Sequence, residues 1–432
     1  MLHSSIPTSF RQAAKLQLYH GASRQLKPPC VFGLRIDGEV DVTLLESSLT
    51  CLARRHTALR SFFPATMSPN SGLCLHPSEV KWHLDCYDLR TRHHGRLLTD
   101  DIAIITRLQQ PLPPDQYPLF RAHLLRYDDH WFLGIAISHI VFDGESVAVF
   151  LRDLEYLYQY LYSGYDPTEV VSTQSDFASF ARWERQWLQS PEARESVRYW
   201  TDVWSGTGPY PTFCLPKDNR RSVYDTNGLW SKALSSDDID RRRAAFGHGH
   251  MSLFALAAGS VLSALGNLTD GADCGLLYTT SRRHLNAADR MIGFLNNRNL
   301  LRVRVSEETN SYEVQNRARE AVLESMDHEI VPFEYLLEQL APNYIDYQPN
   351  DPHIYLNVDS LPPPLRLPGM NSEIVWPVAP GTFDALPYMS VNVSKDKERH
   401  QVTVSCGYST RRFSPGYVNE FMSRIVGSLL LS

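Results

Sequence analysis

The stretch WFLGIAISHIVFDGESVAVFLRDL, residues 131–154, constrains the fold strongly because its hydrophobic period changes once within it. Its first eight residues form an almost unbroken apolar run, which is typical of a strand buried on both faces. Its second half repeats apolar residues at the i, i+3, i+4 spacing of a helix. His139, Asp143 and Gly144 fall at the break. The stretch therefore predicts a buried strand, a short loop and an amphipathic helix, with a histidine where the strand ends.

The position of His139 suggests chemistry, because ligands of α/β proteins tend to bind outside the carboxyl ends of strands. Imidazole titrates near neutral pH, so it can accept a proton from a nucleophile and return it later. Asp143 suits a helix N-cap, and Gly144 permits a tight backbone at the helix start, so Asp143 is interpreted as structural. The alternative is a hydrogen-bonded core histidine and a plain cap, which is the better explanation of an isolated HxxxDG.

The rest of the chain mixes helical and strand patterns, which predicts a mixed α/β (α+β) fold. Residues 120–126 and 131–138 predict a hairpin, with its second strand the buried one. A chain of 432 residues is long enough for two or three folding units. The segment 165–175 is polar and irregular, so it is interpreted as a linker. Two domains are predicted: 1–170, which contains SHIVFDG, and 171–432.

Composition and charge exclude several classes of function. The net charge of −6, a pI near 6.2 and the lack of a long basic run argue against nucleic acid as a partner. No stretch approaches eighteen consecutive apolar residues, so no membrane span is expected, and no secretory signal is evident. The seven cysteines are scattered without CxxC, which favours thiols in a reducing cytoplasm. The histidine pairs His93–His94 and His248–His250 lack neighbouring Cys or Asp clusters, so no metal site is expected.

A series of short motifs gives the chain a family resemblance. SHIVFDG resembles the HHxxxDG core of the condensation domains of nonribosomal peptide synthetases, in the chloramphenicol-acetyltransferase-like superfamily. Other family segments follow in the right order, and they are matched by ARRHTALRSFF (53–63), PLFRAHLLR (118–126), MIGFLNNRNLLRVRV (291–305), VPFEYLLEQLAP (331–342) and FSPGYVNEFMSRIVGSLL (413–430). Each match is weak alone, but together they identify the chain as similar to this family.

The sequence also departs from the family pattern. Ser138 stands where the family has the first histidine of its pair, and the second, functional histidine is retained as His139. The family's SGR reads Ser281-Arg282-Arg283, so Arg283 takes the place of the arginine that pairs with the motif aspartate, with Arg282 as the alternative one position away. The QD before VPFE reads Glu329-Ile330, and the early SxAQxRLW pattern survives only as Ser9 and Gln12. These departures indicate a divergent member.

The resemblance implies two chloramphenicol-acetyltransferase-like subdomains that form a V, with His139 near the middle of a central tunnel. Ser138 and Asn297 are candidates for the tunnel wall, although Asn297 could instead bind the backbone at a strand start. Asp143, Gly144 and Arg283 would be structural residues of the active site. No cofactor or metal of its own is implied, because the substrates are carried on the phosphopantetheine of carrier proteins.

The function implied is condensation of a carrier-protein-bound acyl or peptidyl thioester with an amine or hydroxyl acceptor, which is tethered or a free small molecule. The product would be an amide or ester in nonribosomal peptide or hybrid biosynthesis, for example of an antibiotic. Tethering both reactants removes much of the entropic barrier, and His139 would act as a base or hydrogen-bond the tetrahedral intermediate. The chain is expected to be freestanding, because it contains neither a GGxS phosphopantetheine motif nor an adenylation segment.

Two alternatives remain open at this point. The first is an O-acyltransferase of the same superfamily that uses CoA or polyketide thioesters, although the plant-type DFGWG motif is absent. The second is a catalytically degenerate domain that recruits a partner, against which the retention of the histidine, aspartate and glycine of HxxxDG argues. Carrier proteins are usually acidic, so Arg241-Arg242-Arg243 and Arg220-Arg221 are candidate docking residues, with an ordinary solvated face as the alternative.

Overall fold

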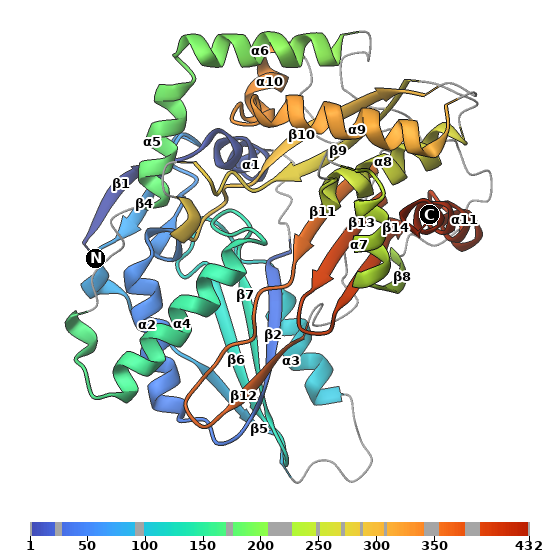
Figure 1. Cartoon of the computed structure of the whole chain (residues 1–432). Coiled ribbons are helices and arrows are strands. Elements are labelled where there is room, and N and C mark those ends of the chain that lie inside the picture. The colour runs from blue at the N-terminus through green and yellow to red at the C-terminus, as the bar shows by residue number, and fades with distance from the viewer. Residues whose placement is uncertain are drawn as a thin grey trace. The chain divides into compact units, whose positions relative to one another are not determined.

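The computed structural model (Figure 1) describes residues 2–21, 28–90, 99–169, 176–205, 227–247, 251–268, 273–285, 288–305, 309–340, 354–375 and 389–430. Its internal contacts divide the chain into two compact units. The first unit contains Met1–Leu188, Ser281–Asn296 and Pro362–Gly381, and the second contains Gln189–Thr280, Asn297–Leu361 and Thr382–Ser432. Both units combine sheets with helices, so the predicted mixed α/β fold is confirmed.

The first unit is built around a sheet whose described strands lie in the order β12 (Asn371–Val375), β2 (Cys30–Asp37), β7 (Trp131–Ile137), β6 (Phe120–Arg126) and β5 (Asp85–Asp88). All neighbours are antiparallel except β5 and β6. The predicted hairpin is β6–β7, and β7 is central and almost entirely buried. A smaller sheet joins β1 (His3–Pro7), β4 (Ser71–Leu75) and β3 (Ser61–Phe62).

Helices α1 (Phe10–His20), α2 (Val42–Arg55), α3 (Thr99–Gln109), α4 (Ser146–Tyr162) and α5 (Phe177–Trp187) belong to the first unit. Its short 3-10 helices are η1 (Thr57–Arg60), η2 (Pro77–Glu79), η3 (Pro167–Glu169) and η4 (Ala288–Arg290). Helix α2 begins where Asp41 accepts the backbone N–H of Leu44 at 2.9 Å, a standard N-cap. The amphipathic spacing predicted after the HxxxDG segment is realised as α4.

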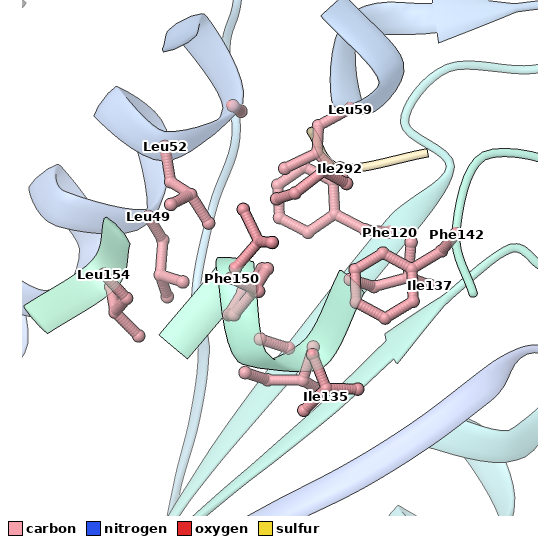
Figure 2. Packing of buried hydrophobic residues seen from close by; sticks show 14 of the residues in the cluster. Leu49, Leu52, Leu59, Phe120, Ile135, Ile137, Phe142, Phe150, Leu154 and Ile292 are labelled. Carbon is pink, nitrogen blue, oxygen red and sulfur yellow. The ribbon is translucent and has the colours of Figure 1, made fainter. Parts of the chain in front are cut away.

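The core of the first unit holds the loop after β7 in place. Figure 2 shows leucines of α2 and α4 packed beside Ile135 and Ile137 of β7, with Phe142 and Phe150 among them. Phe142 stacks on Phe32 and meets the edge of Phe150. Because Phe142 lies between His139 and Asp143 in the chain, this burial anchors the loop that carries both.

The described strands of the second unit form one sheet in the order β10 (Asn297–Arg304), β9 (Asp273–Thr280), β11 (Ile354–Ser360), β13 (Met389–Asp396), β14 (Gln401–Ser409) and β8 (Asn227–Ser235). Strand β11 is parallel to both of its neighbours. The helices are α6 (Pro191–Trp204), α7 (Ser236–Ala244), α8 (Leu253–Gly266), α9 (Ser311–Met326), α10 (Phe333–Leu340) and α11 (Pro415–Leu430). The apolar α8 packs against α9 and α11 in the core of this unit.

The predicted boundary at residue 170 requires correction. Helix α5 lies beyond that boundary but belongs to the first unit, where Glu184 accepts the backbone N–H of Phe10 at 2.8 Å. Residues 281–296 and strand β12 return to the first unit much later in the chain, β12 by pairing with β2. A division into two contiguous halves cannot represent a chain that returns to complete a sheet. None of the described helices is both long and apolar enough to cross a membrane.

Candidate active site

The site is built on the loop between β7 and α4, residues 138–145. The Ser138 N–H donates to Leu119 O at 2.8 Å as the strand ends, and the Val141 N–H donates back to Ser138 O at 3.1 Å. Ile140, Val141 and Phe142 point into the core, and Phe142 is fully buried. The buried residues therefore fix the loop, while His139 stays half-buried.

His139 is held in one tautomer by its own loop. Its Nδ1 lies 2.7 Å from the carbonyl oxygen of Phe142, which can only accept, so Nδ1 carries the proton. The other ring nitrogen, Nε2, therefore has its lone pair available to accept a hydrogen bond. The ring also meets the ring of Phe294 edge-on, with 4.9 Å between centroids. His139 is thus oriented as an acceptor at the end of β7.

The surroundings of His139 keep it neutral. Burial of the ring, followed by the positive charges of Lys15 and Arg11, lowers its pKa to about 3. The hydrogen bond to Phe142 and the charge of Asp143 offset this only in part. A neutral imidazole with so low a pKa accepts hydrogen bonds at neutral pH, but it is a weaker base than an ordinary histidine.

Asp143 is fully buried and receives hydrogen bonds on both carboxylate oxygens. Oδ1 accepts from the Ser146 backbone N–H at 2.9 Å, from Ser146 Oγ at 2.7 Å and from Arg283 Nη2 at 2.6 Å. Oδ2 accepts from the backbone N–H groups of Leu295 and Asn296 at 3.0 and 3.1 Å. Burial alone raises the pKa of this carboxyl, but the Arg283 charge and the hydrogen bonds from Ser146 and Arg283 lower it overall. Asp143 therefore joins its own loop to residues 283–296.

Arg283, and not Arg282, is the partner of Asp143. The Arg283 guanidinium also donates to Ser146 Oγ at 2.8 Å and to the carbonyl of Met291. Arg282 forms a separate, fully buried pair with Glu184, with 2.7 Å between Nη1 and Oε1. The backbone of Arg282 has a positive φ of 52°, a conformation uncommon outside glycine, which lets adjacent arginines reach different carboxylates.

Two structural expectations for this loop need correction. The N-cap residue of α4 is Glu145, and Asp143 lies in the turn before it, although its carboxylate still accepts the Ser146 N–H. Gly144 is exposed and does not have a positive φ, and a Cβ there would meet no described atom within 4 Å. The local backbone therefore does not require glycine at this position.

The two candidates for a tunnel wall differ in their surroundings. Ser138 is 9% exposed at the end of β7. Asn297 is fully buried at the start of β10, where its Nδ2 donates to the carbonyls of Glu329 and Val331 and its Oδ1 accepts the N–H of Phe333. Of the two alternatives for Asn297, the structure shows the hydrogen bonds to the backbone, made at the start of β10.

Several residues near His139 were missed by sequence reasoning. They are Phe294, Ser146 and the cationic pair Arg11 and Lys15. Only Ser146 had a local signal, because it follows Asp143 by three residues, a spacing at which a side chain can bond a turn. The others come from distant parts of the chain, and no spacing rule places them beside His139.

Other candidate sites gain no support. Arg241 and Arg243 form ion pairs with Asp238 and Asp240 one turn earlier on α7, Asp240 also pairs with Lys395, and Arg242 is buried. Arg220-Arg221, His93–His94 and His248–His250 lie outside the described residues. Within the part of the chain that is described, no three His, Cys, Asp or Glu side chains gather as metal ligands. Burial raises the pKa of the Cys30 thiol, at the start of β2, to about 12, so it is not a thiolate nucleophile.

Comparisons with known proteins agree on one family. The family model "Condensation domain" matches residues 16–430. A linear gramicidin synthase of Brevibacillus parabrevis is 30% identical over 320 residues, which is 72% of this chain and 4% of that protein. Malpinin synthetase of Mortierella alpina is 27% identical over 381 residues, which is 85% of this chain and 5% of that protein. The chain therefore spans only a small part of the length of these relatives.

Solved structures show the same fold. The epimerization domain from the third module of tyrocidine synthetase B superposes with a TM-score of 0.81 at 16% identity, covering 100% of this chain and 97% of that one. The X-domain of teicoplanin biosynthesis, in its complex with OxyB, superposes with a TM-score of 0.79 at 21% identity, covering 99% and 93%.

Proposed function

Since this chain belongs to the condensation domain family, we propose that it joins a carrier-protein-bound acyl or peptidyl thioester to an amine or hydroxyl acceptor. Condensation domains generally form amide bonds between substrates bound to carrier proteins, and this gives the reaction class. The substrates would enter on the phosphopantetheine arm of the carrier, and the chain would need no cofactor of its own.

The observation that carries the proposal is the state of His139. Its Nδ1–H donates to the carbonyl oxygen of Phe142, so Nε2 is unprotonated and can accept a hydrogen bond from an incoming amine or hydroxyl. The buried Asp143–Arg283 pair holds the loop and would stabilise an inactive domain as well, so the tautomer and position of His139 are what the proposal rests on. The arrangement therefore favours an active enzyme over a recruiting domain.

The chemistry follows from this geometry. The acceptor nitrogen or oxygen attacks the thioester carbonyl carbon while its N–H or O–H is hydrogen-bonded to Nε2 of His139. As the C–S bond breaks, the proton lost by the acceptor passes through the imidazole to the departing thiolate. Because the pKa of His139 is about 3, we expect the residue to orient a neutral amine more effectively than it deprotonates an alcohol. Amide formation is thus the favoured outcome.

The decisive experiment is intact-mass spectrometry of acylated carrier proteins incubated with the protein and one amine and one alcohol acceptor. The acyl chain should leave the carrier only when an acceptor is present, and His139→Gln should abolish the transfer. The same acyl group should then be offered on carrier protein, pantetheine and CoA at equal concentration. A CoA donor that reacts as fast as the carrier-bound one would refute the proposed condensation and favour the O-acyltransferase alternative.

A further inference from the structure

Arg282 is a buried charge at a position where the family pattern has glycine. The family segment SGR reads Ser281-Arg282-Arg283 in this chain, and the backbone of Arg282 has a positive φ of 52°, which glycine adopts most easily. The side chain is nonetheless fully buried. A charged side chain in a strained and buried position persists only where its contacts compensate for both costs. The contacts of Arg282 therefore indicate its role.

The guanidinium of Arg282 joins helix α5 to the segment that carries Phe294. Its Nη1 donates to Glu184 Oε1 at 2.7 Å, and its Nε donates to the carbonyl oxygen of Leu295 at 2.7 Å. Glu184 is also fully buried, and its other carboxylate oxygen accepts the backbone N–H of Phe10, at the start of helix α1, at 2.8 Å. Helix α1 and the Phe294 segment are thus both bound by one buried ion pair, which we call the Glu184–Arg282 pair.

The Phe294 segment contacts both His139 and its loop. The ring of Phe294 meets the His139 ring edge-on, with 4.9 Å between centroids. The next residue, Leu295, is held by both of its peptide groups, because its carbonyl accepts from Arg282 and its N–H donates to Asp143 Oδ2 at 3.0 Å. The backbone beside Phe294 is therefore fixed between the Glu184–Arg282 pair and the carboxylate of the His139 loop.

Helix α1 supplies another part of the surroundings of His139. Gln12 Nε2 donates to the carbonyl of Ile140, next to His139 in the chain, at 2.8 Å. Burial lowers the pKa of His139 most, followed by the positive charges of Lys15 and then Arg11, which both lie on this helix. The Glu184–Arg282 pair thus binds two segments that determine the environment of the imidazole.

We propose that Glu184 and Arg282 are positioning residues of the active site, which keep the surroundings of His139 in place for the reaction. Arg282 acts through the carbonyl of Leu295, and Glu184 acts through the N–H of Phe10. The inference rests on the proposed function, because the pair has a catalytic consequence only if His139 takes part in the reaction. The competing explanation is that the pair stabilises the first unit and has no effect on His139.

Two variants separate positioning from stability. The double variant Glu184→Gln/Arg282→Met removes both buried charges together and keeps similar volumes, so its melting temperature should stay within about 5 °C of wild type. Arg282→Lys keeps a cation for Glu184, but its single nitrogen replaces the two that bind Glu184 and Leu295. The matched control is Asp273→Asn, which weakens the ion pair with Arg302 in the second unit.

Both variants should lower kcat by roughly tenfold to a hundredfold with little change in KM, the scale expected when a catalytic group is slightly displaced. The pKa of His139 should also rise from about 3 toward its ordinary value of about 6.5, because helix α1 and the Phe294 segment are no longer held against the ring. This pKa is measured by NMR of histidine-labelled protein, with the His139 signal assigned from His139→Gln. Asp273→Asn should change neither quantity.

A folded variant with wild-type kcat and an unchanged His139 titration would overturn the proposal, since the Glu184–Arg282 pair would then serve stability alone. A loss of kcat without the pKa shift, or the shift without the loss, would overturn it as well. If the double variant does not fold, Arg282→Lys is judged by the same criteria. If the wild-type protein transfers no acyl group to any acceptor, the proposed function fails, and the NMR titration alone decides whether the pair controls the surroundings of His139.

Discussion

Removing Asp143 should cost more than removing Arg283, and the two losses should not add. Asp143→Ala leaves the largely buried Arg283 guanidinium without its carboxylate partner. It also leaves the backbone N–H groups of Leu295 and Asn296 without their hydrogen-bond acceptor. Breaking a buried ion pair from one side typically costs about 3 to 5 kcal/mol of the free energy of unfolding. After Arg283→Ala the carboxylate keeps its bonds to Ser146 and to both backbone N–H groups, so we expect a smaller loss, about 2 kcal/mol.

The measurement is a double-mutant cycle by chemical denaturation, followed with both tryptophan fluorescence and circular dichroism. The double variant should lose about 1 to 3 kcal/mol less than the sum of the single losses. The control cycle combines Asp143→Ala with Arg302→Ala, whose arginine pairs with Asp273, and it should be additive within about 0.5 kcal/mol. Strict additivity of the stability losses at Asp143 and Arg283 would show that the two side chains do not stabilise the fold through a shared ion pair.

The pH dependence gives an independent check on the same residue. The pKa of Asp143 is lowered in the folded protein, so the unfolded chain takes up a proton there at higher pH than the folded one. The contribution of Asp143 to stability is therefore complete above about pH 4, the ordinary value for aspartate, and is lost as the pH falls through the folded value. Wild type should lose more stability than Asp143→Asn in that acidic range. Parallel curves for the two proteins would mean that the carboxylate is not stabilised in its charged form.

Three further predictions concern the reaction. His139→Ala should lower product formation by roughly two to four orders of magnitude with little change in thermal unfolding, and wild-type turnover would restore the core-histidine explanation. Because the pKa of His139 is lowered to about 3, the pH–rate profile should show no titration of this residue between pH 5 and 8. A titration near pH 6.5 that disappears in His139→Gln would contradict the lowered pKa. Chelation with EDTA should change neither activity nor melting temperature, and a loss restored by zinc would refute the expectation of metal independence.

Local patterns predicted the elements around the site well. The change of period within residues 131–154 predicted β7, the loop and α4, because a buried strand and an amphipathic helix impose different spacings on one continuous segment. The boundary between the two units was not predictable in this way. Residues 281–296 and β12 join the first unit through contacts with segments more than a hundred residues away, and their own sequence shows no sign of the partner.

The residues of the candidate site differ in the same way: some could be found from a short stretch of sequence, and others only from long-range contacts. The HxxxDG spacing pointed to His139, and the family likeness to Arg283, because each depends on a short stretch of sequence. The environment of His139 depends on three segments that meet only in the folded first unit: α1 with Arg11 and Lys15, the loop after β7, and the segment that carries Phe294. A histidine in the same motif without those cations would keep a higher pKa and would be a stronger base. The motif therefore indicates the histidine that we expect to meet a substrate, whereas helix α1, where this chain departs from the family pattern, supplies the positive charges that, together with burial, lower the pKa of that histidine.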